Sequence, residues 1–143
     1  MVLNLEEKHM NARKHKSQKS RPQLVLAHAN TDYARSVSHY YRQLGWEPHL
    51  VGCGRDARQL ARRLAPAAVI LGTELPDESG WLTCQKLRQE NPDQRVLLVM
   101  AEASSDDYRF AEFVGASALI KEEDGVPALV DEVGQAFSLT SIG

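Results

Sequence analysis

The chain has 143 residues, of which 43% are hydrophobic and 25% are charged, a composition typical of one globular domain, or two at most. No apolar run approaches the roughly 18 residues of a membrane span, and no hydrophobic signal segment is visible, so we expect a cytoplasmic protein without membrane contact. The net charge of −2 is uneven: residues 1–22 carry six basic and two acidic side chains, net +4, and the remainder carries 11 basic and 17 acidic ones, net −6.

Residues 1–22 form the first distinct segment. They contain few apolar residues after Leu5 and no sustained period, which is typical of a disordered tail. The positive charge has two interpretations, a solvated tail that aids solubility or a weak, salt-sensitive contact with nucleic acid or another polyanion. No aromatic residues lie between the basic ones, so stacking on bases is not predicted.

From residue 23 onward, short apolar runs alternate with stretches in which apolar residues recur at helical spacing. Cap residues, glycines and prolines mark the ends of these stretches. The expected elements are strand 24–27, a helix between Asn30 and Gly45, strand 46–53, helix 56–65, strand 67–71, a helix from Trp81 to Asn91, strand 95–101, a helix between Ser104 and Gly115, strand 117–120 and helix 126–137.

This alternation predicts an α/β fold over residues 23–143. Strands joined by helices of roughly 10–15 residues imply a parallel sheet with right-handed crossovers and helices on both faces. Five such strands in about 120 residues suit the doubly wound, flavodoxin-like order 2-1-3-4-5. Cys53 and Cys84 are isolated, without metal-binding spacing, so we expect two reduced thiols.

The segment 67–80, which reads AAVILGTELPDESG, is the centre of this pattern. An unbroken apolar run predicts a strand buried on both faces, and a turn rich in Pro, Asp, Ser and Gly follows it. Ligands of doubly wound sheets bind at the carboxyl ends of the strands. Gly72 therefore stands where a site is expected, although it has no side chain with which to do chemistry.

From residue 23 to about 137 the chain resembles the receiver domains of response regulators, the CheY-like modules of two-component signalling. The resemblance depends on the rhythm of strands and helices and on four local matches at the expected spacing. These are Thr31–Asp32 after the first strand, Leu75–Pro76–Asp77 with Gly80 after the third, Ala101–Glu102–Ala103 after the fourth and Gly115–Ala116–Ser117 before the fifth.

The resemblance implies a site that this chain has lost. In the family, two acidic residues after the first strand help to bind Mg²⁺, and an Asp at the end of the third strand accepts a phosphoryl group. A Ser or Thr after the fourth strand and a Lys after the fifth contact the phosphoryl oxygens. Here these positions hold His28 and Ala29, Gly72, Met100, and Glu122 with Lys121 one residue earlier.

Without an acceptor or metal carboxylates, the resemblance implies a pseudo-receiver that has no metal, no cofactor and no enzymatic activity, because phosphoryl transfer needs an oxygen nucleophile and cations. His28 is either a half-exposed side chain bonded to the backbone or a pH-sensitive or partner-contacting group. Met100 is expected to fill the emptied pocket. Glu74 and Asp77 have three interpretations. They are substitute acceptors, or a fixed negative charge that imitates the phosphorylated state, or simply a solvent-facing residue and a turn residue respectively.

The expected function is a signalling module that acts by protein–protein contact, independently of phosphorylation. The family's surface of fourth helix, fifth strand and fifth helix maps to about residues 106–137 and is the candidate face for a partner or a homodimer. Its candidate residues are Phe110, Leu119, Lys121 and Val130. We expect Phe110, Phe113 and Val114 to form the buried side of the fourth helix. The alternatives are a nucleic-acid-associated transcriptional regulator that uses the basic tail, and a small ligand-binding or enzymatic flavodoxin-like domain.

Overall fold

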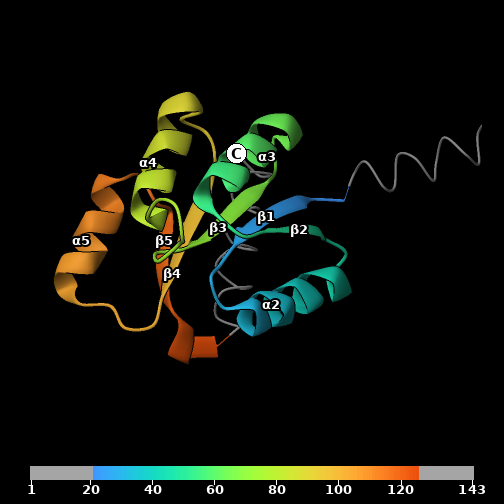
Figure 1. The fold of residues 1–143 in the computed structure, drawn as a ribbon, viewed down its shortest axis with the longest axis horizontal. Coiled ribbons are helices and arrows are strands. Elements are labelled where there is room, and N and C mark those ends of the chain that lie inside the picture. The colour runs from blue at the N-terminus through green and yellow to red at the C-terminus, as the bar shows by residue number, and fades with distance from the viewer. Residues whose placement is uncertain (1–20, 126–143) are drawn as a thin grey trace, which may run out of the picture.

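The computed structural model describes residues 21–125. Residues 1–20 of the expected tail and the expected helix 126–137 lie outside this range. The described residues form a five-stranded parallel sheet in the order β2-β1-β3-β4-β5, which confirms the predicted fold (Figure 1). The elements are β1 (Gln23–Ala27), α2 (Thr31–Gln43), β2 (Glu47–Val51), α3 (Gly54–Leu64), β3 (Ala68–Gly72), α4 (Gly80–Glu90), β4 (Val96–Met100), α5 (Ser105–Phe113), β5 (Ala118–Lys121) and the 3₁₀ turn η1 (Glu122–Asp124).

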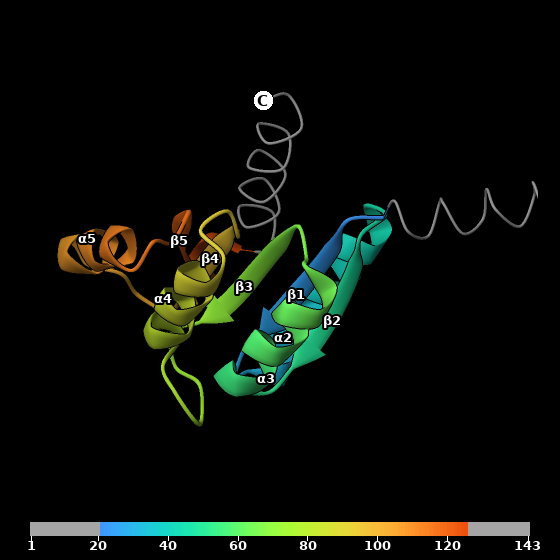
Figure 2. The same ribbon diagram turned by 90° about the horizontal axis from the view of Figure 1, so that it is seen from above.

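Helices lie on both faces of the sheet, as its continuous apolar strands predict, with α2 opposite α3 and α4 in Figure 1, and Figure 2 shows the same layers from above. In β1 and β3, alternate residues such as Leu26 and Ile70 belong to the core beneath α2. Their neighbours, such as Val25 and Leu71, belong to the core that includes residues of α3, α4 and α5. Each of these side chains is fully buried, and burying one of this size stabilises the fold by about 1.5–3 kcal/mol.

The register of the strands brings their carboxyl ends to one edge of the sheet. Ala27 of β1 lies beside Leu71 of β3, Gly72 of β3 beside Val99 of β4, and Met100 of β4 beside Lys121 of β5. The loops that follow β1, β3, β4 and β5 therefore meet at this edge. It is the edge at which a doubly wound sheet binds its ligands.

Helices α2 and α5 begin at the predicted caps. The side chain of Asn30 accepts a hydrogen bond from the Tyr33 amide at the start of α2, and Ser104 and Asp107 form a capping box at the start of α5. Helix α3 begins at Gly54, two residues before the predicted start, and its N-cap residue Cys53 makes no capping bond with its side chain. Its first amides are capped instead from the distant loop that follows β3.

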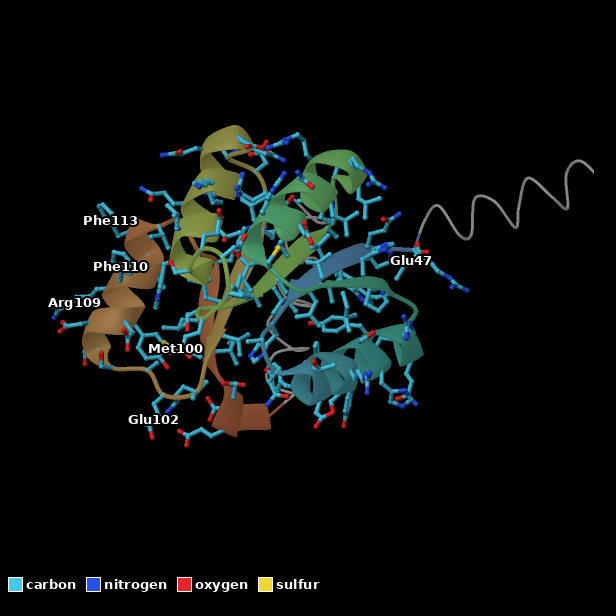
Figure 3. The ribbon with its side chains drawn as sticks, viewed as in Figure 1. Glu47, Met100, Glu102, Arg109, Phe110 and Phe113 are labelled. Carbon is cyan, nitrogen blue, oxygen red and sulfur yellow. The ribbon has the colours of Figure 1, made fainter. Side chains whose placement is uncertain are left out.

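Helix α5 differs from the prediction in the face that it buries. Ala111 and Val114 are buried, but Phe110 is 45% and Phe113 75% exposed, so the expectation that both phenylalanines face inward was wrong. The helix turns its small residue Ala111 toward the sheet, and the two rings stack on each other on the outer side (Figure 3). Among the described residues, no helix has the length and hydrophobicity needed to cross a membrane.

Candidate functional site

A cleft of about 500 Å³ lies at the carboxyl edge of the sheet. It brings together five of the predicted site positions, and Met100 and Glu102 mark the end of β4 that faces it (Figure 3). Lys121 is not among the described residues that line the cleft; its ammonium group pairs with the Glu123 carboxylate at 3.3 Å. The lining consists of His28, Ala29 and Asn30, Gly72, Thr73 and Glu74, Val99, Met100, Ala101 and Glu102, and Glu122.

Both ring nitrogens of His28 make polar contacts. Its Nδ1 accepts a hydrogen bond of 2.9 Å from the Asn30 amide, and its Nε2 lies 3.2 Å from Oε1 of Glu122. An amide N–H can donate only to an unprotonated ring nitrogen, so the proton of the neutral imidazole is on Nε2 and is donated to Glu122. The predicted backbone bond is confirmed, but the side chain is less exposed than predicted, with 9% of its surface accessible.

The surroundings of His28 favour the neutral imidazole. Burial lowers the pKa of His28, and the nearby Glu122 carboxylate opposes this shift without overcoming it. The ring also packs against Tyr33, with centroids 4.6 Å apart. Burial, and secondarily the charge of Glu122, raises the pKa of Tyr33 to about 12, so its hydroxyl stays protonated at neutral pH.

These contacts predict a pH dependence of stability. The folded pKa of His28 lies below its ordinary value of 6.5, so between the two values the unfolded chain binds more protons. Stability is therefore expected to fall as the pH drops below about 6.5. Urea unfolding across this range should show a shallower pH slope for His28→Gln than for the wild type. The exposed His39 serves as the control, and an equal change of slope in His39→Gln would contradict the assignment.

Gly72 is covered by the His28 ring. A Cβ atom added to Gly72 would lie 3.0 Å from Cδ2 and 3.4 Å from Cγ of His28. The imidazole thus takes the space that a side chain at the predicted acceptor position would need. At the carboxyl end of β3 the structure therefore has a histidine ring packed over a glycine.

The loop between β3 and α4 is tied to the start of α3 by Asp77. Its two carboxylate oxygens accept hydrogen bonds of 2.8 Å from the amides of Gly54 and Arg55. These bonds, the one from Arg55 foremost, hold the pKa of Asp77 well below its usual range. Asp77 therefore supplies, from another loop, the capping bonds that Cys53 does not make, a role that the turn motif alone does not indicate.

Glu78 connects the same loop to two helices. Its carboxylate accepts two bonds from the Arg58 guanidinium, at 3.1 and 3.0 Å, one of 2.7 Å from the Thr83 hydroxyl and one of 3.3 Å from Lys86. Burial alone would raise the pKa of Glu78, but these donors outweigh it and the pKa is lowered. The cluster ties the loop between β3 and α4 to both α3 and α4.

Removing the Glu78 carboxylate should destabilise the fold. Glu78→Ala leaves Arg58, whose side chain is only 19% exposed, without its partner, and we expect a loss of about 2 kcal/mol in the free energy of unfolding. The matched control is Glu90→Ala, which removes the exposed pair with Arg62 and should cost less than about 0.5 kcal/mol. Urea denaturation measures both, and equal losses would refute the distinction.

The chemistry available in the cleft is limited. Within residues 21–125, no group of three His, Cys, Asp or Glu side chains is arranged to hold a metal ion. The carboxylates that line it belong to Glu74, Glu102 and Glu122, and Glu74 is exposed to solvent as predicted. Cys53 and Cys84 are free thiols, as expected, and neither lines the cleft.

The predicted partner-face residues differ in their exposure to solvent. Phe110 is exposed, and Lys121 is partly exposed at the end of β5. Leu119 is 7% exposed because its strand places it in the core that includes residues of α4 and α5, so it cannot contact a partner directly, and that prediction needs correction. Val130 lies outside the described residues.

The strand order, the two helical layers and the cleft at the carboxyl edge define the fold of CheY-like receiver domains. No protein-family model matches the chain. A "Probable transcriptional regulatory protein TcrX" of Mycobacterium tuberculosis is 42% identical over 74 residues, which are 52% of this chain and 32% of that protein. "Response regulator GacA" of Pseudomonas aeruginosa is 29% identical over 87 residues, 60% of this chain and 40% of that protein.

Solved structures agree on the fold. A CheY-like response regulator receiver domain protein from Methanospirillum hungatei superposes with a TM-score of 0.79 at 16% sequence identity, covering 85% of this chain and 98% of that one. The chain spans about a third of the length of the first curated relative and 40% of the second. The resemblance to receiver domains is thus supported by sequence and by structure. The activities of the two longer relatives are not assigned to this chain.

Proposed function

We propose that this chain is a pseudo-receiver, a module of two-component type that regulates a partner by protein–protein contact without being phosphorylated. The observation that carries the proposal is the pair of Gly72 and His28. The acceptor position has no oxygen nucleophile, and the imidazole occupies the space for one, since it would lie 3.0 Å from a Cβ atom added to Gly72. Positioning cannot replace an absent nucleophile.

The charges of the cleft support the same proposal. Phosphoryl groups are held by cations, and the family places acidic residues after β1 and a lysine after β5. Here a neutral histidine follows β1, and the carboxylate of Glu122, which follows β5, faces it at 3.2 Å. An incoming phosphoryl group would meet carboxylates in place of cations. We therefore propose a non-enzymatic role for the domain.

The aromatic side chains of α4 and α5 are the partner face that we propose, with Phe110 and Phe113 exposed and Trp81 partly buried. The Trp81 ring lies 5.0 Å from Phe110, and Phe110 stacks on Phe113 at 6.0 Å, which forms a row across both helices. Exposed aromatic groups of this kind are typical of interaction sites. A separate partner and a second copy of the chain are both compatible with this face.

Capture of a partner tests the proposal. The full chain, purified without phosphodonor, should retain a protein from the source cell's extract, and Phe110→Ser with Phe113→Ser should abolish the capture. The matched control is Tyr40→Ser on α2, because Tyr40 is also an exposed aromatic side chain, 43% accessible. Capture that requires Mg²⁺ and a phosphodonor would contradict phosphorylation independence.

A nucleic-acid-associated regulator is the second candidate. Residues 1–22 carry a net charge of +4, and one relative carries the name of a transcriptional regulatory protein. If the tail contacts DNA or RNA, binding should weaken steeply with salt and disappear when residues 1–21 are removed. Contact through the aromatic row should survive the same truncation.

A further inference from the structure

Helix α5 carries its large side chains on the outside of the molecule. Tyr108, Phe110 and Phe113 are all more than 40% exposed, and the buried residue of the helix is the small Ala111. Figure 3 shows Phe110 and Phe113 projecting from α5 away from the sheet. Aromatic rings that gather on one exposed surface mark a place where another molecule binds.

Charged side chains of both signs alternate with the two phenylalanines in the segment 109–113, which reads RFAEF. Arg109 and Glu112 are three residues apart, so they lie on one face of the helix. The Arg109 guanidinium lies 4.0 Å from the Asp106 carboxylate, and both side chains are more than 80% exposed. Glu112 forms no ion pair with any residue between 21 and 125. Both charges are therefore available to a second molecule.

This arrangement is complementary to itself. A two-fold axis makes one residue contact a second residue of the other copy, and the second contact the first in return. Arg109 and Glu112 are about 4.5 Å apart along the helix axis, so an axis between them places each arginine beside the glutamate of an antiparallel copy of α5. The same packing brings the phenylalanines of the two copies together. The chain thus presents both the charges and the apolar surface that its own α5 requires.

We propose that a second copy of this chain covers the aromatic partner face, with the two α5 helices antiparallel and Arg109 of each copy paired with Glu112 of the other. The inference rests on the proposed partner face and names the molecule that occupies it. The contact uses the side of α5 that faces away from β5 (Figure 3). The phenylalanines supply the apolar contact, and the two ion pairs fix the relative direction of the helices.

Sedimentation equilibrium of the full chain over a range of concentrations tests the proposal. The wild type should form dimers, and Arg109→Glu or Glu112→Arg should each weaken the dimer about tenfold, because either change turns two attractive contacts into two repulsive ones. An equimolar mixture of these two variants should recover the affinity of the wild type, because opposite charges then face each other at both contacts. Phe113→Ser should abolish the dimer.

Arg63→Glu is the matched control, because it reverses an exposed charge on α3, away from α5. It should leave the dimer unchanged. A wild type that stays monomeric, or a mixture of the two variants that associates no better than either alone, would overturn the proposal. A monomeric chain that still captures another protein through Phe110 and Phe113 would remove the second copy but leave the partner face in place, so the two proposals can fail separately.

Discussion

Replacing Gly80 with alanine should lower the free energy of unfolding by about 3 kcal/mol. The added Cβ would overlap the carbonyl oxygen of Gly72 and lie 2.9 Å from the Gly72 carbonyl carbon and 3.0 Å from Cα of Thr73. These are backbone atoms at the end of the central strand, so no side-chain rotation relieves the clash. Helix α4 must begin this close to β3 because the Gly80 amide donates a 2.8 Å hydrogen bond to the Thr73 carbonyl.

Urea denaturation followed by circular dichroism measures this loss. Gly52→Ala is the matched control, because a Cβ at Gly52 would meet nothing within 4 Å. The control should change stability by less than about 0.5 kcal/mol. A Gly80→Ala protein as stable as the control would show that α4 is not held against the end of β3.

Gly72→Asp should not restore a receiver site and should destabilise the fold by about 2 kcal/mol. The new side chain would collide with the His28 ring, which lies 3.0 Å from the added Cβ, and would place a second carboxylate near Glu122. His28→Ala alone should also be destabilising, because it leaves the space over Gly72 unfilled.

Combining the two substitutions gives the decisive comparison. In the background of His28→Ala, Gly72→Asp should cost at least about 1 kcal/mol less than in the wild type, because the ring that obstructs it is gone. Unfolding free energies of the four proteins form a double-mutant cycle. Additive losses would mean that His28 and Gly72 do not share the same space.

The architecture was predictable because it follows from local patterns. Continuous apolar runs such as β3 indicate strands buried on both faces, and the caps Asn30 and Ser104 mark where helices begin. Parallel strands align their carboxyl ends, so the convergence of His28, Gly72 and Glu122 on one cleft follows from strand order alone.

The failures concern contacts between segments that are distant in sequence. Asp77 caps α3 although it lies 23 residues further along the chain, and no local motif encodes this contact. The helix begins at Gly54, two residues before the predicted start. Helical spacing identifies Phe110 and Phe113 as one face but not which way it turns. The His28 ring is held over Gly72 by contacts of its two nitrogens with Asn30 and Glu122. Of these two partners, only Asn30 is close to His28 in the sequence.

The cleft at the carboxyl edge should not accept a phosphoryl group. Intact-mass spectrometry of the full chain after incubation with acetyl phosphate and Mg²⁺ tests this expectation most directly. We expect the mass to remain that of the unmodified protein. A stoichiometric gain of one phosphoryl group, located on a carboxylate of the chain, would contradict the account.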